Sequence, residues 1–274
     1  MEYREALKAL KVIPIGELVL HEETVGSLTA HLKGAIAKSE QFTNPIIVDR
    51  RSKVVLDGTH RVKAFAELGY RNIVCQTVDY FSPEIEVGAW YPGLRCANIS
   101  DLLETVKAKK AGFARGMQEV RKMKAPFLLV LDKGRGKECH LVEPVAKPMK
   151  PAVLFALQKY VLSKFARMHT VSYIPDEVSG KFLKTSGAVL LYRRHFSKKE
   201  MLGMALEGVL LPPKTTRHVI PMRILGLDIP LSWLRLPVEE AQAKLDEAVR
   251  KRSATGAIRY YPEPTLVLDD YRFD

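Results

Sequence analysis

The stretch from Val54 to Arg61 constrains the fold of this chain more than any other segment. It opens with an apolar run that ends in Asp57 and Gly58, and residues 62–68 then place apolar side chains at helical spacing. Gly69 follows at the point where such a helix would end. The pattern therefore predicts a short buried strand that turns into a helix, with Asp57 at the carboxyl end of the strand.

The predicted first turn of that helix, residues 58–61, is suited to bind phosphate. Backbone N–H groups in a helix's first turn have no acceptor within the helix and carry partial positive charge. His60 and Arg61 add side-chain donors, and Asp57 can hold a metal ion or accept a proton. Phosphoryl transfer requires such an anion site beside a carboxylate. The structural alternative is that Asp57 caps the helix and Gly58 only makes a turn.

Strand and helix patterns alternate around this motif. Short strands are predicted within residues 10–20, a helix over 24–40, and further strands over 45–48 and 72–80. We therefore expect a compact α/β domain over residues 1–95.

The remaining residues, 96–274, are predicted to form a second α/β domain. Its expected helices and strands are a helix over 102–124, a hairpin of 126–131 with 138–142, a helix over 151–168, strands near 171 and over 188–192, and helices over 196–207 and 237–253. The turn of the hairpin contains Gly134 and Gly136, but no helical pattern follows it. It is therefore not a dinucleotide-binding fingerprint.

Composition limits the class of protein. The chain has 274 residues, of which 47% are hydrophobic and 27% charged, as in folded proteins of one or two domains. No segment reaches the length of a membrane span and the N-terminus has no apolar signal core, so we expect a cytoplasmic protein. Cys75, Cys96 and Cys139 are too widely spaced for a disulfide framework or a metal knuckle. Few Asn and Gln among many Lys, Arg and Glu residues is a pattern of thermophilic proteins.

The positive charge is confined to the second part of the chain. The net charge is +12, yet residues 1–90 hold 11 Lys and Arg against 12 Asp and Glu, while residues 91–274 hold 32 against 19. A basic surface attracts nucleic acid, but it also steers nucleotides and other anions. The half that contains the motif is neutral, so nucleic acid is not the expected partner.

A second segment rich in donors covers residues 212–218. Two prolines stiffen its start, and the donors that follow are Lys214, Thr215, Thr216, Arg217 and His218. Such a loop suits a carboxylate or a phosphate, although a solvated surface loop has the same composition.

The first 90 residues resemble the ParB/sulfiredoxin-like superfamily. The resemblance lies in residues 44–48, in the Asp57-Gly58-x-His60-Arg61 turn, and in the helix that ends at Gly69. Thr59 stands where sulfiredoxins carry their catalytic cysteine, so sulfinic acid reduction would lack its nucleophile. Chromosome-partitioning ParB proteins carry a helix-turn-helix domain next, for which residues 102–124 are a weakly patterned candidate.

Over most of its length the chain resembles the free L-serine kinases, which make O-phospho-L-serine from serine and a nucleotide. Residues 20–22, Leu-His-Glu, are similar to a segment whose glutamate is the proposed base, and residues 212–218 are similar to their C-terminal segment. The resemblance implies that Glu22 and Asp57 are catalytic, that Asp57 supports Mg²⁺ directly or through water, and that Trp90 lies beside the substrate.

The residue types agree with this chemistry. A serine hydroxyl needs a base such as Glu22, whose structural alternative is charge compensation at a helix start. Nucleotide phosphates are expected at Gly58, Thr59, His60 and Arg61. The serine carboxylate needs donors as well, so we expect residues 215–218 to fold back over the N-terminal domain. There Arg217 would bind the carboxylate bidentately, and Thr215, Thr216 and His218 would complete the site. Trp90 would wall this pocket, or else belong to the core.

The sequence therefore predicts a Mg²⁺-dependent phosphotransferase that moves a phosphoryl group from ADP or ATP to free L-serine, in serine and cysteine metabolism. Its active site would lie in the cleft between an N-terminal ParB/sulfiredoxin-like α/β domain and a C-terminal α/β domain. Its partners would be serine and nucleotide, and not a membrane. One alternative is a ParB-like nucleotide-binding regulator that contacts DNA, and another is a kinase for a different small alcohol. The sequence decides neither the nucleotide donor nor the oligomeric state.

Overall fold

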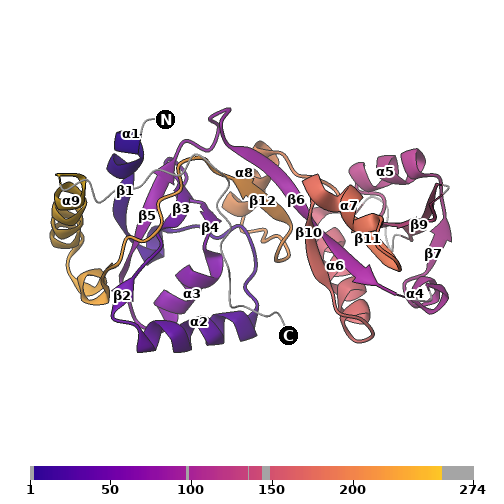
Figure 1. Cartoon of the computed structure of the whole chain (residues 1–274), viewed down its shortest axis with the longest axis horizontal. Helices are drawn as coiled ribbons and strands as arrows, with labels where there is room; N and C mark the ends of the chain where they lie inside the picture. The colour runs from indigo at the N-terminus through magenta and orange to yellow at the C-terminus, as the bar shows by residue number, and fades with distance from the viewer. Residues whose placement is uncertain (1–2, 97–98, 135, 144–148, 255–274) are drawn as a thin grey trace.

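The computed structural model of the protein describes residues 3–96, 99–134, 136–143 and 149–254. They form a mixed α/β molecule with two main β-sheets, and Figure 1 shows the N-terminal elements at one end of the long axis and β7, β9 and α5 at the other. No described helix is long and apolar enough to cross a membrane.

The N-terminal sheet has four strands, in the spatial order β1 (Leu10–Pro14), β5 (Asn72–Val78), β3 (Ile46–Asp49) and β4 (Val55–Asp57). The central pair, β3 and β5, is parallel, and the two outer pairs are antiparallel. All seven residues of β5 are buried, including the polar Asn72, Gln76 and Thr77. Helix α1 (Tyr3–Lys8) precedes this sheet, and α2 (Gly26–Lys38) packs on α3 (Thr59–Glu67).

The predicted strand–turn–helix is confirmed. Asp57 is the last residue of β4, and Gly58 precedes α3 with a φ of 99°. A residue with a side chain rarely adopts this φ, which explains the glycine. Gly69 follows α3 with a φ of 73°, as expected for a helix end. Within residues 10–20 only β1 forms a strand, while η1 (Ile15–Glu17) is a 3-10 turn.

The C-terminal sheet contains seven strands. Its main order is β10 (Ser172–Pro175), β6 (Glu86–Arg95), β11 (Ala188–Tyr192), β8 (Leu128–Asp132), β9 (Lys137–Val142) and β7 (Ala108–Lys110), and β12 (Thr216–Val219) also pairs with β6. Every pairing is antiparallel. One apolar cluster contains side chains of α4 (Ser100–Thr105), α6 (Pro151–Ala166) and α8 (Lys198–Leu206), and another contains those of α5 (Phe113–Arg121) and α7 (Ser179–Leu183).

The prediction of one helix over residues 102–124 is wrong in its middle. Helix α4 ends before Lys107, whose φ is 49°, and β7 then pairs with the edge of β9 before α5 begins. Pairing with a strand more than 30 residues away overrides the local helical preference here. The predicted hairpin and the predicted helices over 151–168 and 196–207 are confirmed as β8–β9, α6 and α8.

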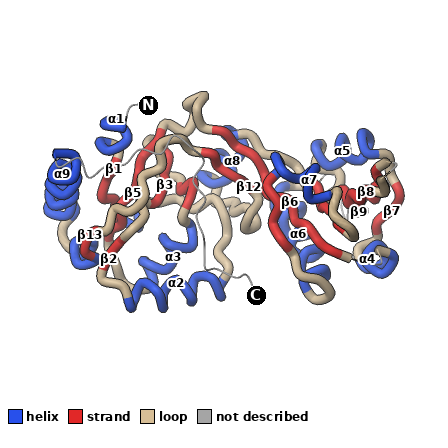
Figure 2. The backbone as a smooth tube through the Cα atoms, in the orientation of Figure 1, coloured by secondary structure: helices blue, strands red, loops and turns tan. Residues whose placement is uncertain are grey.

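The end of the described chain returns to the N-terminal sheet (Figure 1 and Figure 2). There β13 (Ile229–Pro230) pairs with β2 (Gln41–Phe42), and η3 (Leu231–Arg235) and α9 (Val238–Ala254) follow. Leu234 and Leu245 are fully buried in the apolar cluster that holds β1 and β5. The helix predicted over 237–253 therefore forms, but one side of it covers the N-terminal sheet. The boundary predicted after residue 95 stays a prediction, and this packing runs across it.

The apolar cluster that contains side chains of α4, α6 and α8 also connects the two parts of the molecule. Leu56 and Tyr80, from the N-terminal part, share it with Phe155, Val189 and Leu211. This shared core fixes the motif turn against the C-terminal segment that contains the donor-rich loop.

Candidate active site

At the end of β4, the Asp57 carboxylate accepts hydrogen bonds from two arginine side chains. Its Oδ2 accepts hydrogen bonds from Arg61 Nη2 at 3.1 Å and from Arg223 Nη2 at 2.5 Å. Arg61 also donates through Nη1 to the carbonyl oxygens of Asn44 and Pro45, at 2.5 and 3.3 Å, so its guanidinium is fixed beside the start of β3. The sequence predicted Arg61 here and missed Arg223.

These arginines keep Asp57 ionised. Partial burial raises the pKa of the Asp57 carboxyl, but the positive charges of Arg61 and Arg223 outweigh this and hold the pKa below its usual value. The side chain is still 40% exposed. The end of β4 therefore presents a charged, accessible carboxylate next to the backbone amides at the start of α3.

His60 ties α3 to the start of α2. Its Nε2 accepts a hydrogen bond from the backbone N–H of Val25 at 2.9 Å, which requires the neutral ring. Burial lowers the pKa of His60 and Lys214 lowers it further, whereas Glu22 acts in the opposite direction. As a donor to phosphate, the role expected from the sequence, His60 would use Nδ1–H.

Glu22 is held by the donor-rich loop. Residues 21–23 pair with Leu211, which donates to the carbonyl of His21 at 2.8 Å and accepts from the N–H of Glu23 at 2.9 Å. The Glu22 carboxylate accepts from the backbone N–H and the hydroxyl of Thr216, at 3.2 and 3.0 Å, and from the N–H of Lys214 at 3.4 Å. Glu22 is 15% exposed, so its carboxylate is oriented and mostly shielded from water.

His21 connects Glu22 with β4. The ring is buried, its Nδ1 hydrogen-bonds the carbonyl of Val55, and its Nε2 lies 3.1 Å from the Thr216 hydroxyl. A buried histidine thus joins the strand that ends at Asp57 to the threonine that holds Glu22. The sequence showed His21 only as part of the Leu-His-Glu segment.

His218 is half-buried and contacts Tyr80 and His21. Its Nε2 is 2.9 Å from the Tyr80 hydroxyl, and its ring meets that of His21 edge to face, with centroids 5.3 Å apart. Burial lowers the pKa of His218 to about 3, with a further lowering by His21 and an opposing effect of Asp57. This imidazole is therefore neutral at ordinary pH, and its Nε2 accepts a hydrogen bond from the Tyr80 hydroxyl.

The donors expected around the serine carboxylate do not form one ring. Thr216 faces Glu22, whereas Arg217 lies with its Cζ 5.9 Å from the centroid of Trp90 and pairs with Glu177 through Nη1 at 2.5 Å. Thr215 is 1% exposed and donates its hydroxyl to the carbonyl of Pro212 at 2.6 Å. Successive side chains of a strand point to opposite sides, which separates Thr216 from Arg217.

Trp90 lies in β6 beside two cationic side chains. Lys214 Nζ is 5.4 Å from its ring centroid, and Arg217 approaches the same ring. The backbone carbonyl of Trp90 accepts from Nε of Arg193, a buried residue just after β11 that the sequence did not single out. No motif marked Arg193 or Arg223, because both lie outside the segments that the sequence singled out.

Among the described residues, the only carboxylate that this arrangement assigns to a divalent metal ion is that of Asp57. Within the described ranges there is no group of three or more His, Cys, Asp or Glu side chains placed to hold a metal. Mg²⁺ is commonly bound by one or two carboxylates together with substrate phosphates and waters, so this donor set fits it when nucleotide is present. Both arginines contact Oδ2 of Asp57, and the carboxylate of Asp57 would hold the metal ion.

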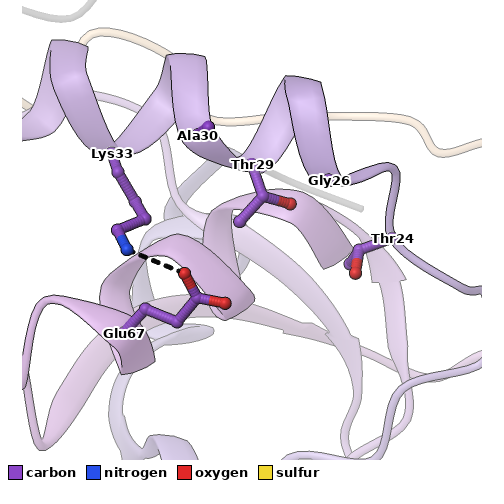
Figure 3. A pocket seen from close by; sticks show the side chains of 6 residues that line it. All are labelled: Thr24, Gly26, Thr29, Ala30, Lys33 and Glu67. Atoms are coloured by element: carbon purple, nitrogen blue, oxygen red, sulfur yellow. Dashed lines mark ion pairs between the residues drawn. The ribbon is translucent and has the colours of Figure 1, made fainter.

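A hollow between α2 and α3 lies apart from these residues (Figure 3). Its lining includes Thr24, Thr29 and the ion pair of Lys33 Nζ with Glu67 Oε2 at 2.9 Å. The hydrogen bond from Lys33 lowers the pKa of Glu67. None of the predicted site residues lines this hollow.

Known proteins resemble the chain over most of its length. No protein-family model matches the sequence. The chain is 25% identical over 243 residues to an ATP-dependent L-serine kinase of Desulfurococcus mucosus, covering 82% of this chain and 90% of that protein. It is also 25% identical over 237 residues to an ADP-dependent L-serine kinase of Thermococcus kodakarensis, covering 81% and 91%.

The ParB resemblance is limited to a shorter segment. A ParB-like protein of Sulfolobus acidocaldarius is 37% identical over 70 residues, which are 26% of this chain and 35% of that protein.

Solved structures confirm the fold. A free serine kinase in complex with AMP superposes with a TM-score of 0.68 at 19% identity, covering 82% of this chain and 93% of that one. A C-terminally truncated SbnI of Staphylococcus aureus superposes with a TM-score of 0.71 at 18% identity, covering 91% and 99%. The expected α/β architecture is therefore confirmed.

Proposed function

We propose that this chain, which belongs to the ParB-like free serine kinases, transfers a phosphoryl group from an adenine nucleotide to the hydroxyl of free L-serine. The product would be O-phospho-L-serine. The observation that carries the proposal is the junction of Glu22, Thr216 and the Asp57 turn, bridged by His21. This junction supports a site with a shielded base on one side and an anion-binding helix start on the other, and the relatives named L-serine kinases support serine and a nucleotide as its substrates.

Glu22 acts as the general base. The serine oxygen attacks the terminal phosphorus of the nucleotide, and its proton passes to the Glu22 carboxylate as the new O–P bond forms. The bond from that phosphorus to the bridging oxygen breaks, and its electron pair leaves with the nucleotide, as ADP from ATP or as AMP from ADP. The donors from Thr216 and Lys214 hold the carboxylate in place during this transfer.

The turn over residues 58–61 binds the nucleotide phosphates. Backbone N–H groups at the start of α3 point to the anion, and Arg61 adds positive charge. Asp57 would hold Mg²⁺, whose charge offsets the negative charge that develops on the transferred group. Arg223 helps to keep Asp57 ionised, and it adds a second positive side chain, besides Arg61, next to Asp57.

Assignment to the cytoplasm, where nucleotide and free serine are both available, is part of the proposal. The relatives include both ATP- and ADP-dependent kinases, so either nucleotide is a candidate donor.

The test is an assay of the purified chain with L-serine and Mg²⁺, run separately with ATP and with ADP. Phosphoserine identified by mass spectrometry or ³¹P NMR is the expected product with at least one donor. A panel of other small alcohols tests the substrate class, and turnover of one of these in preference to serine would overturn the assignment of serine. No phosphorylated product with either donor would refute the kinase function.

The regulator alternative finds no support in the described fold. Residues 102–124, the candidate for a DNA-reading helix pair, are divided by β7 into α4 and α5. Strong DNA binding that weakens with salt would be the observation in its favour.

A further inference from the structure

The guanidinium of Arg193 is buried with two of its three nitrogens unpaired. The residue is 1% exposed, and its Nε donates to the backbone carbonyl of Trp90 at 3.0 Å. Its Nη1 and Nη2 are buried and have no hydrogen-bond partner in the part of the chain that the structure describes. An unpaired charge in the interior is costly, so this position calls for an anion that the chain itself does not supply.

The neighbours of Arg193 place it at the acceptor side of the proposed site. Burial lowers the pKa of Arg193 to about 10, while Tyr173, Glu22 and Tyr91 act in the opposite direction. The geometric link to Glu22 runs through Trp90: its carbonyl accepts from Arg193 and its ring lies beside Lys214, whose backbone N–H donates to the Glu22 carboxylate. With a pKa of about 10, Arg193 is still charged at neutral pH.

The other arginines of the site already have acidic partners. Arg61 and Arg223 both contact Asp57, and Arg217 pairs with Glu177. The reaction brings in two kinds of anion, the nucleotide phosphates and the serine carboxylate. The phosphates have the turn at Asp57, whereas the carboxylate needs a cation near Glu22, because the hydroxyl that Glu22 deprotonates lies only a few bonds away from it.

We propose that Arg193 binds the α-carboxylate of the serine substrate through Nη1 and Nη2, and so aims the serine hydroxyl at Glu22. This inference rests on the proposed kinase function. The Trp90 carbonyl fixes Nε, which leaves the two outer nitrogens as a fork that matches a carboxylate bidentately. Both nitrogens are buried in this structure, so binding of serine would require neighbouring side chains to move aside. Arg193 would replace Arg217 as the carboxylate-binding residue.

The test compares Arg193→Lys and Arg193→Met with Arg194→Lys, a control at the adjacent arginine, which pairs with Glu200. We expect Arg193→Lys to raise the KM for serine roughly 10- to 100-fold, because a lysine cannot make the bidentate contact. The KM for nucleotide and the melting temperature should stay near those of the wild type. Arg194→Lys should match the wild type throughout.

Ethanolamine, which has the hydroxyl and amine of serine but no carboxylate, separates binding from a structural role. The wild type should prefer serine strongly, and Arg193→Met should reduce this preference roughly 10- to 100-fold while leaving turnover of ethanolamine unchanged. An equal loss for both acceptors would show that Arg193 only supports the fold around Trp90, and an unchanged serine KM in both variants would also overturn the inference. Failure of the kinase proposal looks different, because the wild type would then form no phosphoserine.

Discussion

Glu22 and Thr216 are separated by 194 residues in the sequence, yet one hydrogen bond of 3.0 Å joins their side chains. Such a contact sets the orientation of the Glu22 carboxylate. For a catalytic base, the orientation matters as much as the residue type. Glu23, the next residue, points elsewhere and pairs with Lys159 Nζ at 2.8 Å. The two adjacent glutamates therefore form a natural matched pair for mutation.

We expect Glu22→Gln to reduce kcat by about 10²–10⁴-fold, since the amide cannot accept the serine proton. Nucleotide binding and the melting temperature should change little, because the amide is of similar size and its oxygen can still accept from Thr216. Steady-state kinetics with thermal melting check both points. Glu23→Gln should be mild, and near-normal turnover of Glu22→Gln would remove Glu22 from the mechanism.

The lowered pKa of His218 predicts that the folded protein loses stability at acid pH. Its pKa is lowered to about 3 in the fold, against about 6.5 for an unfolded histidine. Below pH 6.5 the unfolded chain binds a proton at this residue that the folded chain does not bind, so the free energy of unfolding falls as the pH drops toward 3. The groups that act on the ring are His21, Asp57, Tyr80 and Lys198.

Melting curves from pH 7 to pH 4 test this contribution. In His218→Gln the amide oxygen can still accept the Tyr80 hydroxyl, but the residue does not titrate. The variant should therefore lose less stability than the wild type over the same pH range. Parallel curves for the two proteins would contradict a neutral His218 in the folded chain.

Among the elements, the β4–α3 turn depends most strictly on a single position. A Cβ at Gly58 would lie 2.6 Å from Ile46 Cδ1 and 2.9 Å from Arg61 Nη2, at a φ of 99°. The added Cβ would displace the Ile46 side chain and the guanidinium that contacts Asp57. The glycine thus keeps both the backbone turn and the arginine in position.

Gly58→Ala should lower the free energy of unfolding by about 1–3 kcal/mol and raise the KM for nucleotide, because strain and the displaced Arg61 act together. Gly34→Ala is the control within α2, where nothing lies within 4 Å of the new Cβ, and it should be neutral or slightly stabilising. Urea unfolding and nucleotide titration provide the two measurements. Equal behaviour of the two variants would show that the turn tolerates a side chain.

Local elements were predictable from the sequence where neighbouring residues determine them. Strand β4, Gly58 and α3 follow from an apolar run, a glycine and a helical period, and all three formed as predicted. Strand β7 was missed because its pairing with β9 is not local. The separation of Thr216 from Arg217 was missed for the same reason, since the sequence does not show that β12 pairs with β6. Arg193 and Arg223 could not be assigned to the site from the sequence, because their partners Trp90 and Asp57 lie more than 100 residues away.

At the scale of the whole molecule, the packing of η3 and α9 on the N-terminal sheet contributes to the free energy of unfolding. Helix α9 contacts β1, and η3 contacts β5, so the last described residues complete the first sheet. Leu245 is fully buried in that contact, whereas Arg250 on the same helix is exposed.

Leu245→Ala should lower the free energy of unfolding by about 2–5 kcal/mol, through lost burial and the cavity that remains. Because Leu245 is remote from Glu22 and Asp57, kcat well below the melting temperature should be that of the wild type. Arg250→Ala should change stability by less than about 0.5 kcal/mol. Denaturant unfolding of the three proteins checks the order, and an unaffected Leu245→Ala would mean that α9 does not stabilise the sheet.

The position of η3 and α9 also limits how the N-terminal segment can be transferred between genes. The segment shared with the ParB-like relative is 70 residues long, and recombination could move a piece of that size between genes. In this protein, however, Val12, Phe42 and Val74 share their apolar cluster with Leu234 and Leu245, more than 150 residues further along the chain. A transplanted N-terminal module would leave that face open to water and to self-association. Any new fusion partner would therefore have to bring its own cover for the sheet.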